Sequence, residues 1–371
     1  MLELLLGFGL SALASFLVLR YAHTHARFSG DHDMSGPQKF HAKAVPRVGG
    51  AGILFGMLGA LLLAWAQRPQ GPVLGLTLLA CSAPAFLAGL AEDLTKAQSP
   101  RRRLFFTAVS AGLAAWTMGA VINRTDILGL DWIVSFGPLA VLVTVFAVAG
   151  VANAVNIIDG FNGLAAMCVV MMLSAIAYVA FQAGDSAVMM CALAGVGAVL
   201  GFFVWNFPAG LIFLGDGGAY LLGFYVAELS ILLLQRNPRV SPMFPLLVCI
   251  YPIFETVFSI YRKKFLRGMS PGVPDGVHFH MLVYRRLMRL AVGDRTAKAL
   301  TRRNSMTSPY LWMLCMLAVV PAMIFWDNSA VLRAQPGGQR RCCPAAVSGE
   351  RVLIGRECGL RIHLCFAIIP D

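Results

Sequence analysis

The chain has 371 residues, of which 58% are hydrophobic and only 13% are charged, and its formal net charge is +12. Soluble domains usually carry about a quarter charged residues, so this composition excludes an ordinary soluble enzyme and indicates an integral membrane protein. Nine cysteines occur without a CxxC pair or a zinc spacing, so neither a zinc site nor a disulfide framework is predicted.

Apolar runs recur from the first residues onward. The first run has no basic segment before it and no cleavage site after it, which predicts a membrane span and not a signal peptide. Because a membrane helix needs roughly 20 apolar residues, we expect an all-α polytopic protein with about ten transmembrane helices. The expected spans are 2–19, 49–66, 73–91, 104–122, 132–152, 164–183, 186–205, 217–234, 243–261 and 309–326.

Lysine and arginine are unequally distributed over the loops between these spans. Loops 20–48, 92–103 and 262–308 hold twenty of them, whereas the loops on the opposite side hold four. Positive loops face the cytoplasm, so we expect the N-terminus outside and these loops inside. The predicted partner of this charge is anionic membrane lipid, and no nucleic-acid motif accompanies it.

The first two positive loops each bring polar residues to a span end. Lys39 and His41 can neutralise a lipid phosphate at the bilayer surface, although positive-inside residues without a substrate contact are an equal explanation. Glu92 and Asp93 close the third span. Adjacent helical side chains point about 100° apart, so one acid can hold a metal while the other faces a substrate. A wet span end is the alternative.

The segment 153–163 carries a polar residue at every third position, namely Asn153, Asn156, Asp159 and Asn162. Residues three apart lie on one helix face, and the glycines that follow Asp159 and Asn162 end the helix. This pattern predicts amides and a carboxylate directed at a phosphate and its metal. Ordinary capping explains one such residue well and four in register poorly.

Asp216 lies in a GDGG sequence that opens the eighth predicted span. Glycines let backbone N–H groups approach a phosphate, and a carboxylate there can bind Mg²⁺. For Asp216 taken alone, a plain N-cap is the better explanation. His278 and His280 follow in the longest basic loop, where imidazoles can donate to phosphate or to a nucleotide.

Two further acids, Glu228 and Glu255, fall inside predicted spans, where buried acids are costly and therefore functional candidates. Glu255 is nearer the cytoplasmic end and can pair with a basic group of the last loop. Five loop acids and six of the seven histidines share this predicted face, which indicates a common site. The five acids are Glu92, Asp93, Asp159, Asp216 and Asp275.

In this order, KFHAKAVPRVGG, AEDLTK, NAVNIIDGFNGLA, GDGGAYLLGF and PDGVHFH resemble motifs of the polyprenyl-phosphate N-acetylhexosamine-1-phosphate transferases, over residues 1–326. The resemblance implies transfer of a sugar 1-phosphate from a UDP-N-acetylhexosamine to undecaprenyl phosphate, with release of UMP. It further implies dependence on Mg²⁺, with Mn²⁺ as a substitute, and a site on the cytoplasmic face of a bacterial inner membrane. The product would start a cell-surface polysaccharide such as O-antigen, and a homodimer remains open.

The resemblance also assigns roles to residues. It implies catalytic roles for Asp93, Glu92 and Asp159, and metal binding by Asp216 and Asp159. We expect Asp93 to act as a general base that deprotonates the acceptor phosphate, or to orient that phosphate. The implied substrate-binding residues are Lys39, His41, Asn153, Asn156, Asn162, His278 and His280.

Three positions depart from the usual family pattern. Glu92 stands where a first Asp is common, Asn162 stands where a second carboxylate is common, and Met281 stands where another His is frequent. A His-poor loop argues against the enzyme that makes lipid I for peptidoglycan and fits the antigen-initiating branch better.

A transporter or flippase of a polyanionic lipid or nucleotide sugar is the alternative function. Transporters commonly bind substrate near the bilayer midplane between repeats, whereas here the polar groups gather at one face without an internal repeat. Residues 327–371 are expected to be an irregular tail, because four cysteines and no span occur there. We interpret this tail as frame-shifted, with a disordered extension as the alternative.

Overall fold

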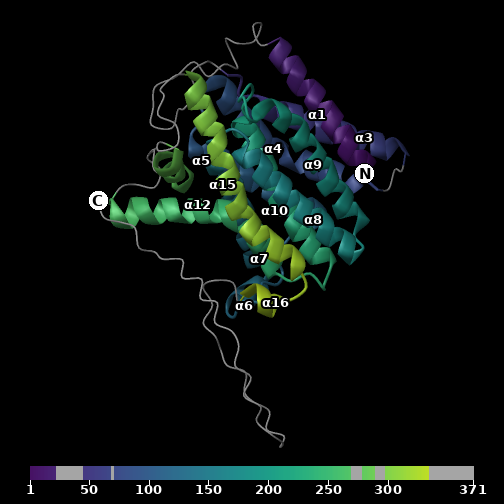
Figure 1. Ribbon diagram of the computed structural model, residues 1–371. Helices are drawn as coiled ribbons and strands as arrows, with labels where there is room; N and C mark the ends of the chain where they lie inside the picture. Colours follow the sequence, from purple (N-terminus) through teal and green to yellow (C-terminus); the bar gives the residue numbers. More distant parts are fainter. Residues whose placement is uncertain (22–44, 68–70, 269–277, 289–296, 334–371) are drawn as a thin grey trace, which may run out of the picture.

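The structure is a computed structural model that describes residues 1–21, 45–67, 71–268, 278–288 and 297–333 (Figure 1). Over these ranges the chain is helical and has no β-strand, which confirms the predicted all-α class. Lys39 and His41 lie outside the described residues, as does the tail from residue 334. Residues Ser329–Arg333 of the predicted tail form a short helix, α16, that packs on α11, Met243–Val248.

Eight of the described helices are long and apolar enough to cross a membrane. They are α1 (Leu2–Arg20), α3 (Gly49–Gln67), α4 (Val73–Thr95), α7 (Gly137–Ile158), α8 (Leu164–Ala183), α9 (Ser186–Asn206), α10 (Gly215–Arg236) and the part of α15 (Ala297–Ile324) from Thr301. The remaining helices are α5 (Pro100–Met118), α6 (Leu130–Val134), α12 (Ile250–Tyr261) and α13 (Phe279–Val283), with π-helical turns at Arg262–Leu266 and Tyr284–Met288.

Several predicted spans differ from the structure by four residues or more. The span expected at 132–152 is α7, which runs from Gly137 to Ile158 after the separate short helix α6, and the span expected at 309–326 is the later part of α15, which begins at Ala297. The span expected at 104–122 is α5, which begins four residues earlier because Ser99 caps it by accepting a hydrogen bond from the Arg102 N–H at 3.3 Å. The span expected at 243–261 is broken into α11 and α12 at Cys249. Pro252 lies in the first turn of α12, where a proline needs no helical N–H partner, so the chain restarts its helix there. Figure 1 shows α12 running across the direction of α15 and out of the bundle.

Helix α10 forms the centre of the bundle. Every residue from Gly215 to Leu234 is buried, and α10 packs on α3, α4, α7 and α8. A helix that is apolar all round is stable only when surrounded. Its N-terminus therefore meets the ends of its neighbours inside the protein.

Helices α1 and α9 pack with almost no side chain between them. A Cβ added to Gly197 of α9 would lie 2.0 Å from the Leu4 carbonyl oxygen, and one added to Gly201 would lie 2.3 Å from that of Phe8. Backbone atoms cannot yield as a flexible side chain can, so glycine is required at this crossing. Small residues commonly provide such close approach in membranes.

We therefore expect Gly197→Ala to lower the stability of the protein by about 1–3 kcal/mol, the usual cost of overpacking. Thermal unfolding in detergent measures the effect. Gly112→Ala in α5 is the matched control, because a Cβ there meets no atom within 4 Å and alanine favours a helix. Equal unfolding temperatures for the two variants would contradict the packing described for α1 and α9.

The chain direction brings five helix ends to one face of the bundle. The C-terminal ends of α4 and α7 meet the N-terminal ends of α3, α5 and α10, as the contacts below establish. At the opposite end of the bundle, Arg236 at the C-terminus of α10 forms an ion pair with Asp185, with an Nε–Oδ2 distance of 2.7 Å. The polar motifs thus share one face because α10 runs antiparallel to α4 and α7.

Candidate active site

Asp93 of α4 caps the central helix α10. Its Oδ1 accepts a hydrogen bond from the Asp216 N–H at 2.9 Å, and its Oδ2 accepts one from the Gly217 N–H at 2.8 Å. The side chain is 1% exposed. The first N–H groups of a helix lack internal partners and carry partial positive charge, so a carboxylate stabilises them. These N–H groups, predicted as a phosphate cradle, are therefore already occupied by a carboxylate.

Glycines make this approach of α4 to α10 possible. A Cβ on Gly89 would lie 2.6 Å from backbone atoms of Asp216 and Gly217. Gly215 has φ +76°, a conformation that glycine adopts at little cost, and a Cβ there would lie 2.6 Å from Asp93 Oδ2. The glycines of the GDGG sequence thus serve helix packing and the turn before α10.

Asp216 stands at the centre of a polar cluster with Arg47, Arg103 and Asn156. Arg103 forms an ion pair with Oδ2, while Arg47 Nη2 lies 3.6 Å from Oδ1. The Asn156 amide donates to Oδ1 at 3.0 Å. The cluster joins the segment before α3 to α5, α7 and α10. Two guanidinium groups beside one carboxylate leave donors that can also bind phosphate oxygens.

Asn153 lies one turn before Asn156 on α7 and belongs to the same cluster. Its Oδ1 accepts a hydrogen bond from the Tyr220 hydroxyl at 3.4 Å. The Arg103 guanidinium lies over the Tyr220 ring, 5.8 Å from its centroid. Tyr220 therefore supports both Asn153 and Arg103 from within α10.

Asp159 is the residue that ends α7, and it is only partly exposed, with its carboxylate turned away from solvent. Burial raises the pKa of Asp159 to about 7, because charge is disfavoured away from water, and the positive charge of Arg47 only partly offsets this. The Asp93 and Asp159 carboxylates also repel each other electrostatically. Asp159 thus belongs to the same electrostatic neighbourhood as Asp93 and Arg47.

The two histidines are buried beside the turn that carries Asp159. His278 Nδ1 lies 2.8 Å from Ser259 Oγ, and the His278 and His280 rings stack with centroids 5.4 Å apart. His280 contacts Glu255 of α12 and packs on Gly160. Glu255 therefore pairs with a group of the last loop, as the sequence indicates.

Two predicted site residues lie elsewhere. The Glu92 carboxylate accepts a hydrogen bond from the Gln98 N–H at 2.7 Å, so it closes the loop after α4 and does not join Asp93. The Asn162 amide donates to the Pro208 carbonyl and to Ser305 Oγ, both at 3.2 Å, which ties the turn after α7 to α15. Their contacts are those of structural residues.

Arg47, Arg103 and Tyr220 are members of the cluster that sequence reasoning missed. Both arginines lie in loops whose positive charge is fully explained by membrane topology, so counting charges could not single them out. The available signal was that both arginines lie next to motifs or spans: Arg47 precedes the glycine pair Gly49–Gly50, and Arg103 directly precedes the span expected at 104–122.

The oxygen-rich donor set suits a hard divalent cation. Carboxylates of Asp216 and Asp159 and the amide oxygen of Asn156 are groups that Mg²⁺ prefers, and Asn156 is joined to Asp216 by a hydrogen bond. Within the described ranges, no three His, Cys, Asp or Glu side chains converge closely enough to hold a metal alone. Substrate phosphates and water would have to complete the shell, which is usual for Mg²⁺.

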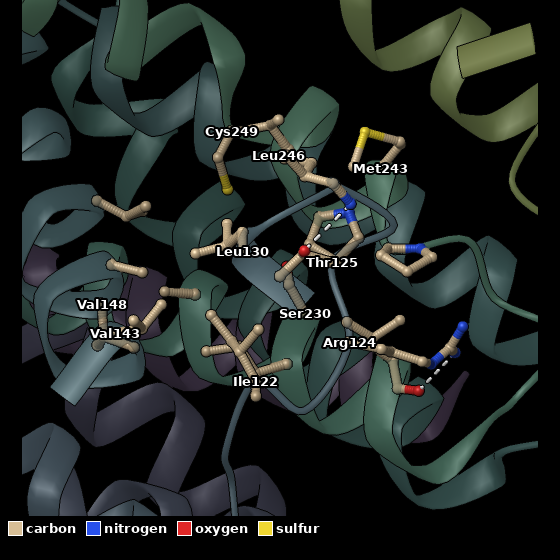
Figure 2. Close-up of a pocket in the computed structure, with 18 of the residues that line it drawn as sticks. Ile122, Arg124, Thr125, Leu130, Val143, Val148, Ser230, Met243, Leu246 and Cys249 are labelled. Carbon is tan, nitrogen blue, oxygen red and sulfur yellow. Dashed lines mark hydrogen bonds between the residues drawn. The ribbon is translucent and has the colours of Figure 1, made fainter. Parts of the chain in front are cut away.

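A separate apolar cavity of ≈ 220 Å³ lies between α7, α10 and the α11–α12 junction (Figure 2). Figure 2 shows Val148, Leu130 and Cys249 around it, with Arg124 and Thr125 at one side. Arg124 donates to the carbonyl oxygens of Leu234, Asn237 and Val240, which places that side at the face opposite the Asp216 cluster. The lining is otherwise almost entirely apolar.

Known proteins share this sequence pattern. Residues 75–234 match the profile of glycosyl transferase family 4. The chain is 32% identical to an undecaprenyl-phosphate alpha-N-acetylglucosaminyl 1-phosphate transferase of Haemophilus influenzae, over 74% of this chain and 77% of that protein. It is 28% identical to a probable undecaprenyl-phosphate N-acetylglucosaminyl 1-phosphate transferase of Bacillus subtilis, over 80% of each chain. A protein of Thermotoga maritima with the first of these names is 29% identical, over 74% and 80%.

Proposed function

The chain belongs to glycosyl transferase family 4, and on that premise we propose that it transfers an N-acetylhexosamine 1-phosphate from a UDP-sugar to undecaprenyl phosphate. The observation that carries the proposal is the gathering of Asp216, Asn156, Arg47 and Arg103 at the meeting point of helix ends. The lipid product would start a cell-surface polysaccharide. The relatives' names support the acceptor and the kind of group transferred.

The proposed site faces the cytoplasm of a bacterial inner membrane. Its support is the excess of lysine and arginine in the loops on the side of the Asp216 cluster, since positive loops remain inside. UDP-sugars are water-soluble, so a face in contact with cytoplasm suits the donor. Undecaprenyl phosphate would present its phosphate at the same membrane surface.

In the proposed reaction an oxygen of the acceptor phosphate attacks the sugar-bearing phosphorus of the donor. The pyrophosphate P–O bond breaks, and its electron pair leaves with UMP. Both reactants are polyanions, so catalysis requires positioning and neutralisation of charge more than covalent chemistry. Arg47 and Arg103 would bind phosphate oxygens, while Tyr220, whose hydroxyl is bound by Asn153, would hold Arg103 in place.

Asp216 and Asp159 would hold Mg²⁺, with the Asn156 amide beside them. The ion would supply further charge neutralisation at the pyrophosphate. Because both Asp93 oxygens accept backbone hydrogen bonds, we assign Asp93 to positioning α10 and Asp216, in place of the general base expected from the sequence.

The raised pKa of Asp159 makes cation binding depend on pH. A proton must leave Asp159 before its carboxylate can bind a cation. A group with pKa about 7 goes from about one tenth to about nine tenths ionised between pH 6 and pH 8, so Mn²⁺ affinity should rise about ten-fold over that range. Electron paramagnetic resonance of free Mn²⁺ measures it. Asp159→Asn should bind weakly at both values, and a wild-type affinity independent of pH would refute this assignment.

The apolar cavity would receive part of the prenyl chain. Ala147 lines it from α7, and Ala147→Trp would fill it. We expect KM for undecaprenyl phosphate to rise about ten-fold and KM for the UDP-sugar to stay constant. Leu142→Trp on the outer surface of the same helix is the control. Unchanged kinetics with Ala147→Trp would exclude the cavity as a prenyl site.

Purified protein in detergent tests the proposed function directly. A panel of UDP-N-acetylhexosamines with undecaprenyl phosphate, with Mg²⁺ or with a chelator, should yield UMP and a lipid pyrophosphate sugar with at least one donor and only with the cation. A transporter would move its substrate across vesicles without releasing UMP. Absence of product with every donor would overturn the proposal.

A further inference from the structure

Glu255 is a fully buried acid of α12 whose carboxylate has defined partners. Its Oε1 accepts hydrogen bonds from the Tyr251 hydroxyl and from the His280 N–H, each at 3.1 Å. Its Oε2 lies 3.3 Å from His280 Nδ1. Tyr251 belongs to the same helix, so the link that matters for the tertiary structure joins α12 to His280 at the start of α13.

His280 in turn packs on the turn that follows α7. A Cβ added to Gly160 would lie 2.9 Å from His280 Nε2, so the ring occupies the space that a side chain at Gly160 would need. The Phe161 ring meets the His280 ring edge to face, with centroids 5.5 Å apart. Gly160 directly follows Asp159, so the position of the imidazole limits where the Asp159 backbone can lie.

The His280 side chain is too deeply buried to contact a substrate directly. Its side chain is 0% exposed, and Nε2 has no hydrogen-bond partner among the described residues. A ring enclosed by Glu255, Gly160 and Phe161 cannot contact a substrate without leaving these neighbours. The contacts therefore favour an indirect role, in which the ring transmits the position of α12 to the turn at Asp159.

We propose that Glu255 is a positioning residue that acts through His280 to hold the Asp159–Gly160 turn. An effect of Glu255 on the rate of catalysis rests on the proposed function. Its effect on the conformation of the Asp159–Gly160 turn does not. Groups that orient the binding residues of a site typically change activity by about 10–100-fold when removed. Glu255 and His280 would then act on kcat through Asp159, with little effect on the affinity for the UDP-sugar.

Hydrogen–deuterium exchange of the full-length protein in detergent tests the contact without any substrate. Glu255→Gln keeps the size of the side chain and removes its charge, and should speed exchange at the amides of Phe161, Asn162 and Gly163 about ten-fold. Glu228→Gln is the matched control. Glu228 is also fully buried and lies in α10, and neither of its oxygens has a hydrogen-bond partner within the described part of the chain. This control should leave exchange in the turn unchanged.

Gly160→Ala approaches the same contact from the other side and should loosen the turn to a similar degree, because its Cβ displaces His280. Unaltered exchange in the turn with both Glu255→Gln and Gly160→Ala would overturn the proposal. The proposal would also be overturned if Glu255→Gln and Glu228→Gln speeded hydrogen exchange equally throughout the protein. That result would show a general cost of changing a buried acid.

Steady-state kinetics provide a second, independent test of the role of Glu255. We expect Glu255→Gln to lower kcat about ten-fold and to leave KM for the UDP-sugar within about two-fold, with Glu255→Asp intermediate. A large rise in KM at constant kcat would show that His280 binds the donor directly. If the wild-type protein turns over no UDP-sugar, the proposed function fails, and the exchange measurement still decides whether Glu255 holds the turn.

Discussion

Asp216→Asn is expected to reduce turnover by about a thousand-fold, the upper range for removing one preorganised charged group from an active site. The Asp216 carboxylate forms ion pairs with Arg47 and Arg103 and accepts a hydrogen bond from the Asn156 amide. An asparagine keeps the shape but loses the charge that orders both guanidinium groups and that would bind a cation. The measurement is UMP release per folded protein, together with Mn²⁺ affinity, which should fall in parallel.

Asp131→Asn is a suitable control for this variant. Asp131 accepts hydrogen bonds from the Thr125 N–H at 2.6 Å and hydroxyl at 2.7 Å, and it lies at the opposite face. The control removes one partly buried acceptor charge without touching the cluster, so turnover should stay near that of the wild type. An Asp216→Asn protein with near-normal turnover would remove the cluster from the reaction altogether.

Asp93→Asn is expected to lose stability and turnover together. The asparagine oxygen can accept from one of the two N–H groups at Asp216 and Gly217, but its amide nitrogen would face the other donor. Leaving a buried donor unsatisfied costs about 1–3 kcal/mol. Because Asp216 lies in the first turn of α10, loosening this turn should also displace the carboxylate on which the reaction depends.

Thermal unfolding and UMP release, measured on one preparation, separate the two possible roles of Asp93. Asp185→Asn is the matched cap control, since Asp185 Oδ1 accepts from the Val188 N–H at the start of α9, at the opposite face. It should lower stability and spare turnover. Wild-type stability with abolished turnover in Asp93→Asn would favour the general base over the cap.

Membrane spans were predictable because bilayer thickness sets the length of an apolar run. Helix α8 has the predicted bounds, 164–183, and α3 and α9 each differ by one residue at the C-terminal end. The expectation fails where local chemistry overrides hydropathy. Prolines in the run 243–261 let the chain restart as α12, and a serine cap starts α5 ahead of its arginines.

The sequence by itself determined the all-α membrane class, most of the spans and the polar residues that share a face, because alternating chain direction places successive loops on known sides. Only the tertiary structure decided which of these residues meet. In the folded protein, Asp93 caps α10, whereas Glu92 binds the Gln98 N–H. Asn162 binds α15, and Arg47 and Arg103 pair with Asp216. The physical reason is that hydrogen bonding and charge pairing depend on distances of a few ångströms between helices, and no pattern along one chain specifies how neighbouring helices are rotated.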